Sequence, residues 1–341
     1  MNSLKTNENS PAQEQAIQKL IALLSAKMLK ENPQPGHMKR DAHPKMIGLL
    51  RAEFIIEENL ADDLKVGLFA TQKTHSAWVR FSNQLAPPGG DDVKDIRGMA
   101  LKILGVAGKK ILEGQEDEQT QDFITITTDA FVTKNIEQFA DLITALVAGK
   151  LHLVFYFLCH PKNLWNLLRA NKRFGSLLEA SFFSVSPYAF GNKVVKYSIK
   201  PQSGFQTPIV PKSTQNYLTT VMEKQLGEKD YFFDFRIQFQ ADPEKTPVED
   251  LSVRWKEADS PFIKVATIKI PKQEFNTEAQ IAFGDQLSFS PWHCLPEHTP
   301  LGGVNRARKV IYDTLSKFRH SKNNLPLIQP TTLEINFNLN Q

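Results

Sequence analysis

Three residues near the C-terminus, Arg308, Tyr312 and Arg319, stand at positions i, i+4 and i+11. In a helix, at about 100° per residue, Tyr312 and Arg319 lie roughly 40° and 20° from Arg308 around the axis, so all three share one face. We expect Asn305 to cap the start of this helix. A phenolate accepts charge-assisted hydrogen bonds from a guanidinium group, so Arg308 favours an ionised Tyr312. Such an anionic oxygen is an uncommon but suitable ligand for a haem iron.

The same helix face is also consistent with an ion-pair and packing stripe, which is the commoner use of these residue types. The neighbouring residues favour the metal site. The stretch Arg308-Lys-Val-Ile-Tyr312-Asp-Thr314, continuing to Arg319, resembles the proximal haem helix of the catalase family, whose pattern is R-x-x-x-Y-x-x-x-x-x-x-R.

Three further segments resemble the same family, and they occur in the family's order along the chain. They are Arg40-Asp-Ala-His43, similar to R-x-x-H; Val79-Arg80-Phe81-Ser82 with Asp95-Ile-Arg97-Gly98-Met-Ala100-Leu-Lys102, similar to V-R-F-S and D-x-R-G-x-A-x-K; and Gln121-Asp122-Phe123 with Phe131 and Phe139, similar to the strand and loop that border the haem. The resemblance extends over roughly residues 36 to 320. Four blocks in order are much more specific than any one of them.

The resemblance implies that His43 is the distal acid/base, on the side of the iron opposite Tyr312. Pro44 disfavours helix just before it, so His43 is expected on an extended segment or a turn. A neutral imidazole there takes a proton from the peroxide and returns it to the departing oxygen, so the O–O bond breaks heterolytically. Ser82, as in the family, would hydrogen-bond His43 and fix its tautomer. Without the resemblance, a solvated loop histidine is the simpler interpretation.

The resemblance also implies a cofactor, haem b with ferric iron, and Tyr312 as the metal ligand. Arg308 would support Tyr312, and Phe139 would stack on the porphyrin. Arg40, Arg80 and Arg319 would pair with the haem carboxylates, for which a guanidinium fork is better suited than an ammonium group. The competing interpretations are surface ion pairs for the arginines and plain core packing for Phe139.

One departure from the family's pattern concerns the distal asparagine. In the segment Asp122-Phe-Ile-Thr-Ile126-Thr127-Thr128, which aligns with it, Ile126 or Thr127 takes its place. Thr127 is the polar candidate for a catalytic role. Losing one hydrogen-bond donor to the peroxide costs about 2 to 4 kcal/mol of transition-state stabilisation. A more apolar distal pocket suits a hydroperoxide with an organic tail, as in catalase-related peroxidases and fatty-acid hydroperoxide isomerases. The sequence leaves open whether the reaction is that of a catalase, a peroxidase or an isomerase.

Composition sets compatible limits. The 341 residues are 41% hydrophobic, include 23 Phe and can build a substantial core. The net charge of +4 is spread over intermixed acids and bases, which gives no reason to expect nucleic acid. Cys159 and Cys294 are widely separated, so neither a disulfide framework nor a zinc site is indicated. The polar N-terminus has no secretory signal, and we expect a cytoplasmic protein.

Periodicity predicts an α+β fold. A helix is expected over residues 11–31, and strands near 46–56, 76–82, 98–106, 122–127, 193–200, 232–240, 251–255 and 262–270, with helices from 136 to about 172 between the two groups of four. Eight antiparallel strands favour closure into a β-barrel, because closure removes exposed edges. The family resemblance implies the same barrel, with surrounding helices. The apolar run 142–159 is broken at Gly149-Lys150, so we interpret it as two packed helices rather than a membrane span.

We divide the chain into an N-terminal helical arm (1–35), a catalase-like barrel with a helical insertion (36–290) and a proximal haem helix with tail (291–341), without a C-terminal flavodoxin-like domain. The leading hypothesis is a haem enzyme that cleaves hydrogen peroxide or an organic hydroperoxide. The alternative is a haem-binding or lipid-binding protein without turnover. Peripheral membrane contact stays open, and relatives of this kind suggest a homo-oligomer by analogy.

Overall fold

The computed structural model describes residues 8–84, 90–91, 93–210 and 214–335. Its centre is an antiparallel sheet with the strand order β5-β4-β3-β2-β1-β9-β8-β7-β6. The strands are β1 (Lys45–Ile56), β2 (Thr74–Asn83), β3 (Arg97–Leu104), β4 (Thr120–Ile126), β5 (Phe182–Phe183), β6 (Tyr188–Phe190), β7 (Lys193–Pro201), β8 (Tyr231–Phe239) and β9 (Phe262–Ile270).

The sheet closes on itself through β5. Ile126 of β4 pairs with Phe183, and Phe182 pairs with Ile199 of β7. Strand β6 pairs with the other end of β7, so β5 and β6 together occupy one position of the barrel. The barrel therefore has eight positions, all antiparallel, and the predicted eight-stranded barrel with surrounding helices is confirmed.

One of the eight predicted strands is wrong. Residues 251–255 form turns, in which the Asp250 carboxylate accepts hydrogen bonds from the backbone N–H and hydroxyl of Ser252. The eighth position belongs instead to β5 and β6. These strands have two and three residues and are separated by Val185, whose φ of 61° breaks the extended chain. Pieces this short carry no alternation that a sequence pattern can detect.

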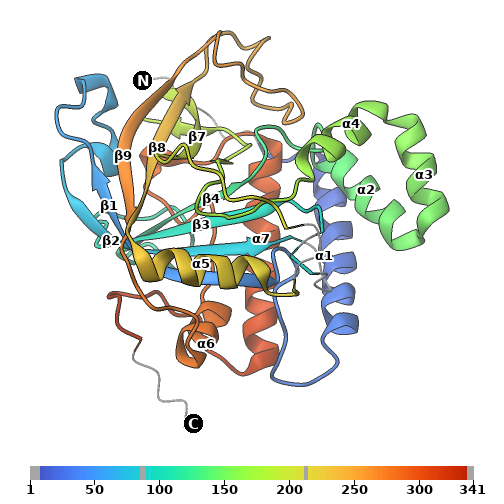
Figure 1. The fold of residues 1–341 in the computed structure, drawn as a ribbon. Helices are drawn as coiled ribbons and strands as arrows, with labels where there is room; N and C mark the ends of the chain where they lie inside the picture. Colours follow the sequence, from blue (N-terminus) through green and yellow to red (C-terminus); the bar gives the residue numbers. More distant parts are fainter. Residues whose placement is uncertain (1–7, 85–89, 92, 211–213, 336–341) are drawn as a thin grey trace.

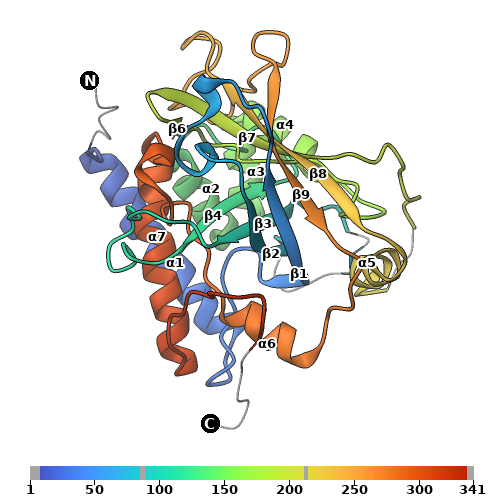
Figure 2. The same ribbon diagram turned by 90° about the vertical axis from the view of Figure 1, so that its left-hand side faces the viewer.

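The helices are α1 (Pro11–Glu31), α2 (Ile136–Ala148), α3 (Lys150–Cys159), α4 (Pro161–Ala170), α5 (Tyr217–Glu228), α6 (Glu278–Gln286) and α7 (Gly303–Asn323), with 3₁₀ turns at Asp62–Leu64, Gly67–Phe69 and Pro296–His298. Helices α1 and α7 lie side by side along one side of the barrel (Figures 1 and 2) and share an apolar cluster with α2. Helices α2, α3 and α4 form an excursion that projects away from the barrel (Figure 1). The predicted break between two helices at Gly149 is confirmed.

The predicted helix cap at Asn305 is wrong, because α7 begins earlier, with Gly302 as its N-cap. The Asn305 amide lies inside the helix, where it donates to the carbonyl oxygens of Leu301 and Pro187. Among the described residues, no helix is both long and apolar enough to cross a membrane.

Aromatic packing inside the barrel accounts for much of the phenylalanine content. Phe123 lies 4.8 Å from Phe235 and 5.0 Å from Tyr197 between ring centroids, and Phe54 lies 5.2 Å from Phe235. Alternation along the strands sends the neighbouring side chains to the outside of the barrel. The outer face of β2 to β4 is therefore free to carry polar residues, and α7 lies on this side of the barrel (Figure 1).

Candidate active site

His43 lies against the outer face of the barrel in the loop between α1 and β1. Its φ of 54° is a left-handed backbone conformation that few residues other than glycine adopt, and such strain is typical of functional sites. Nδ1 of His43 lies 3.2 Å from Oγ of Ser82, and a guanidinium nitrogen of Arg80 donates to its carbonyl oxygen at 3.0 Å. The structure thus brings into contact His43, Ser82 and Arg80, three of the site residues that the sequence predicted.

Gly98 makes this position of the imidazole possible. It pairs with Ser82 across β2 and β3. A Cβ atom on residue 98 would lie 2.7 Å from Nδ1 of His43 and 2.8 Å from Oγ of Ser82, well inside normal contact. The D-x-R-G segment therefore needs glycine at this position, because the imidazole of His43 packs directly against the backbone of residue 98.

The imidazole of His43 is held in its neutral form. Burial lowers its pKa from 6.5 to about 3, and the nearby charge of Arg80 adds to the effect. Because Nδ1 contacts Ser82, the ring presents Nε2 away from the strand. A neutral ring with one free nitrogen is the form that a proton acceptor requires.

Three arginines, Arg40, Arg80 and Arg319, form a cationic cluster beside His43. Burial lowers the pKa of each, and repulsion from Arg40 adds to this at Arg80 and at Arg319, whose pKa falls to about 9. The carboxylate of Asp285 opposes the shift at all three. Within the described residues none of the three makes a salt bridge. The negative charge of Asp285 is therefore the one nearby carboxylate charge for three positive guanidinium groups.

The C-terminus of α6 provides part of the compensation. Arg40 donates to the carbonyl oxygens of Gly284 and Leu287, both at 2.9 Å, and Arg319 donates to that of Leu287 at 3.2 Å. Cations are favoured at this end of a helix. Arg80 has less support, since it is 3% exposed and its Nε has no hydrogen-bond partner among the described residues. A buried, unpaired guanidinium donor fits an anionic group, such as the carboxylates of haem.

On α7, Arg308 and Tyr312, which the sequence predicted to be a proximal haem pair, lie in contact. Nη2 of Arg308 lies 3.3 Å from the phenolic oxygen, and the guanidinium group lies 5.1 Å from the centre of the ring. Arg308 also donates to Ser186 and Tyr188. Burial lowers the pKa of Arg308, but Tyr312 and Tyr188 outweigh this and leave it raised. Arg308 therefore stays charged beside the phenolic oxygen of Tyr312.

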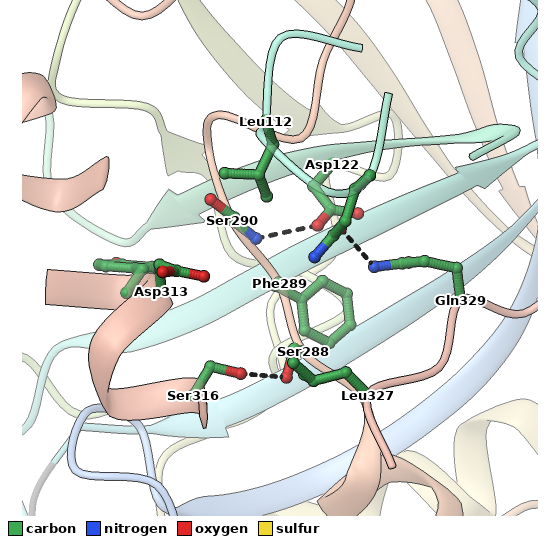
Figure 3. Close-up of a pocket in the computed structure, with 11 residues that line it drawn as sticks. Leu112, Asp122, Ser288, Phe289, Ser290, Asp313, Ser316, Leu327 and Gln329 are labelled. Atoms are coloured by element: carbon green, nitrogen blue, oxygen red, sulfur yellow. Dashed lines mark hydrogen bonds between the residues drawn. The ribbon is translucent and has the colours of Figure 1, made fainter. Parts of the chain in front are cut away.

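Tyr312 is one of the residues that line a small cavity, and Figure 3 shows its neighbours Asp122, Ser290 and Ser316 there. Residues of α7, the segment 288–290 and Asp122 of β4 line this cavity. Ser316 hydrogen-bonds Ser288 at 2.6 Å, and the N–H of Ser290 donates to Asp122 at 2.9 Å. The cavity has about 20 Å³, room for about one water molecule. The chemistry of the side chains around it suits a haem, but the cavity as it stands is too small to hold the macrocycle.

Two further predicted residues have local packing roles. Phe139 packs against Phe131, with ring centroids 5.3 Å apart, and against the apolar cluster of α1 and α7. Thr127 accepts a hydrogen bond from the backbone N–H of Arg97 at 3.0 Å through its hydroxyl oxygen. The residue that pairs with Gly98, and so shares its sheet face with Ser82, is Ile126. By register, Ile126 rather than Thr127 stands on the side of His43.

Sequence reasoning missed Asp285, which lies too far from any recognised motif to signal a role. It also missed the buried ion pair between Lys102 and Asp122, with 2.6 Å between Nζ and Oδ1. Burial raises the pKa of Asp122 to about 6 although Lys102 opposes the shift. Both residues lie in the motif segments that resemble the catalase family, and the alternation of β3 and β4 could have placed them on the same outer face.

Comparison with known structures identifies the fold. A bacterial catalase superposes with a TM-score of 0.68 at 19% identity, over 100% of this chain and 68% of its own. A fungal catalase (TM-score 0.67, 18% identity, 89% and 65%) and catalase A from Saccharomyces cerevisiae (0.67, 19%, 92% and 69%) are similar to the same extent. This chain has the catalase fold.

The likeness is one of structure. No protein-family model and no curated protein sequence matches the chain. The chain spans about two thirds of the length of the catalases it superposes on. At 18–19% identity the comparison shows the catalase fold alone, so the chemistry of the site has to be argued from its own residues.

Proposed function

We propose that this chain is a haem-dependent oxidoreductase of the catalase kind, which cleaves the O–O bond of hydrogen peroxide or of an organic hydroperoxide such as a fatty-acid hydroperoxide. One observation carries the proposal. The guanidinium groups of Arg40, Arg80 and Arg319 gather beside a neutral, strained His43 with one nearby carboxylate among them. The two carboxylates of a haem would supply the negative charge that this cluster lacks.

Haem, when bound, supplies a ferric iron at which a peroxide is activated. Tyr312 is the residue that would ligate it, because its oxygen already lies beside the charge of Arg308. An anionic oxygen ligand stabilises the ferric state. Arg319 stands seven residues after Tyr312 on the same helix, roughly 10 Å further along its axis. One rigid element therefore sets the distance between the ligand and the arginine cluster.

His43 would move the proton. Its Nε2 is directed away from Ser82 and accepts a proton from the peroxide, then returns it to the departing oxygen. Ser82 fixes the ring through Nδ1, and Arg80 fixes the backbone through the carbonyl oxygen. With a pKa of about 3, His43 is neutral in the free protein throughout the physiological pH range.

The substrate class follows from the residue beside His43. Ile126 stands on the same sheet face as Ser82 and offers no hydrogen bond, and the Thr127 oxygen is occupied by Arg97. Without a second polar group, stabilisation of a small peroxide is reduced by about 2 to 4 kcal/mol. We therefore propose an organic hydroperoxide as the better substrate. Whether a donor is oxidised or the hydroperoxide rearranges is left to the assay.

The test uses the haem-loaded protein and two variants. We expect Tyr312→Phe to change the absorption spectrum of the bound haem, and His43→Gln to leave that spectrum nearly intact while hydroperoxide consumption falls by about 100-fold or more. Tyr217→Phe, which removes a phenol that donates to the Pro208 carbonyl, is the control for the first change. His37→Gln, at an exposed histidine, is the control for the second. An unchanged spectrum in Tyr312→Phe would refute the assignment of the ligand.

The second candidate is a haem-binding or lipid-binding protein without turnover. The apolar Ile126 beside His43, in place of a polar distal side chain, favours it. The strained, neutral His43 argues against it, because storage requires no distal base. Haem-loaded protein that consumes neither hydrogen peroxide nor a fatty-acid hydroperoxide would decide for this candidate. A homo-oligomeric assembly stays a prediction.

A further inference from the structure

Helix α3 exposes an apolar stripe instead of burying it. Leu151, Val154, Phe155 and Leu158 are 84%, 58%, 69% and 74% exposed. Their spacing of i, i+3, i+4 and i+7 places all four on one side of the helix. In a globular protein a stripe of this kind normally faces the core. Here the residue on the inner side, Tyr156, is buried, so the helix has its apolar stripe turned to the outside.

The helices on either side of α3 expose apolar side chains as well. Leu146 and Val147 at the end of α2 are 55% and 56% exposed, and Trp165 and Leu168 on α4 are 64% and 63% exposed. We call these eight residues, the four of α3 and these four, the apolar face of α2–α4. Its helices project from the barrel (Figure 1). Scattered exposed leucines are normal in soluble proteins, but a concentration like this one marks an interaction surface.

From the second half of α2 onward the charges have a single sign; of the two acids before it, Glu137 and Asp141, Asp141 pairs with Lys19 of α1. Residues 142–178 contain no Asp or Glu, but they contain Lys150, Lys162, Arg169, Lys172 and Arg173. Arg169 is paired with Asp129, and the other four are exposed. Over the whole chain acids and bases nearly balance, at 37 and 41, so this stretch departs from the average. An apolar face with cations around it is complementary to a partner that has an apolar interior and negatively charged groups at its surface.

We propose that the apolar face of α2–α4 docks on an anionic lipid membrane. The side chains of α3 would enter the boundary between headgroups and acyl chains, and the lysines would lie at the headgroups. Trp165 has the side chain that is enriched at this depth of a bilayer. With ten residues, α3 is roughly 15 Å long, half of a hydrocarbon core of about 30 Å, so it lies in the interface and does not cross it.

Charge distinguishes a membrane from a second copy of the chain as the occupant. A symmetric dimer through this face would bring the patch against itself, since a two-fold interface uses the same residues on both sides. Lys150 and Lys162 would then face cations, without a carboxylate from residues 142–178 to pair with them. An anionic lipid surface has the complementary charge.

Membrane docking goes beyond the proposed function and does not depend on it, because the apolar face contains none of the candidate haem residues. The two proposals fit together in one respect. Fatty-acid hydroperoxides form in and partition into membranes, so a docked protein would meet this substrate where it is concentrated. Failure of either proposal leaves the other intact, since one is measured by vesicle binding and the other by haem spectra and turnover.

The experiment is co-sedimentation of the full chain with phosphatidylcholine vesicles that contain or lack phosphatidylglycerol. We expect binding to the anionic vesicles that weakens as salt is added. Phe155→Ser combined with Leu158→Ser should reduce binding by about 10-fold or more. These side chains are exposed, so the fold is expected to tolerate the change. Phe205→Ser, at a phenylalanine that is 65% exposed elsewhere, is the matched control and should bind as the parent does.

Fluorescence gives an independent readout. Trp78, Trp255 and Trp292 are at most 6% exposed, so Trp165 is the tryptophan that a vesicle would desolvate. A blue shift on adding anionic vesicles, lost in Trp165→Leu, supports docking. The proposal is overturned if the chain does not bind anionic vesicles, or if the Phe155/Leu158 variant binds as well as the parent. It is equally overturned if that variant only dissociates a dimer of the chain and vesicles are not bound by either form.

Discussion

Gly98→Ala tests the geometry of the site most directly. The new Cβ would lie 2.7 Å from Nδ1 of His43, about 0.7 Å closer than the 3.4 Å at which ordinary contact begins. The imidazole cannot swing aside freely, because its backbone is held in a left-handed conformation and bonded to Arg80. Overpacking of this kind costs about 1 to 3 kcal/mol. Replacing glycine also lowers the conformational entropy of the unfolded chain, which stabilises the folded protein by about 0.5 to 1 kcal/mol.

We therefore expect Gly98→Ala to lower the free energy of unfolding by up to about 2.5 kcal/mol, measured by urea denaturation. The matched control is Gly227→Ala in α5, where a Cβ meets nothing within 4 Å. Because alanine favours helix over glycine, this control should raise the free energy of unfolding by about 0.5 to 1 kcal/mol. The two substitutions are chemically identical and have opposite expected signs.

Activity gives the second measurement. A displacement of the acid/base by close to 1 Å reduces turnover by about 100-fold. In haem-loaded Gly98→Ala we expect hydroperoxide consumption to fall to that extent, with the haem spectrum close to that of the parent. Two results would refute the reasoning. Gly98→Ala as stable as Gly227→Ala would show that the imidazole does not rest on residue 98, and full turnover would show that its position there is irrelevant to the reaction.

Two further predictions concern buried bases. Burial lowers the pKa of Lys196 to about 7, while an unfolded lysine keeps one near 10.5, so stability falls as the pH drops from 10 to 7. Lys196→Met should remove this slope and add about 2 to 4 kcal/mol at pH 7 in urea denaturation; an unchanged slope would contradict it. His298, an acceptor for the N–H of Leu68, has its pKa lowered by burial to about 3, against 6.5 when unfolded. Going from pH 7 to 5 should therefore cost about 2 kcal/mol more in the parent than in His298→Gln, and equal losses would refute this.

Much of this protein could be predicted from the sequence because the signals are local. Alternation over seven or more residues located the longer strands, and helical spacing located α1 and the shared face of Arg308 and Tyr312. Ordered motifs placed His43, Ser82 and Arg80 in one site, which the structure shows in contact. The domain boundaries and the haem roles of these residues stay predictions.

Tertiary structure decided what depends on contacts between distant segments. The two short strands β5 and β6 exist because β7 pairs with them, not because of their own sequence. Asn305 lies within α7 instead of capping it, and its side-chain amide donates to the carbonyl oxygens of Leu301 and Pro187. The contact between Gly98 and the imidazole of His43 exists only in the folded chain. The same is true of the position of Asp285 near the three arginines. Periodicity reports which face a residue occupies, whereas contact distances depend on how the whole barrel closes.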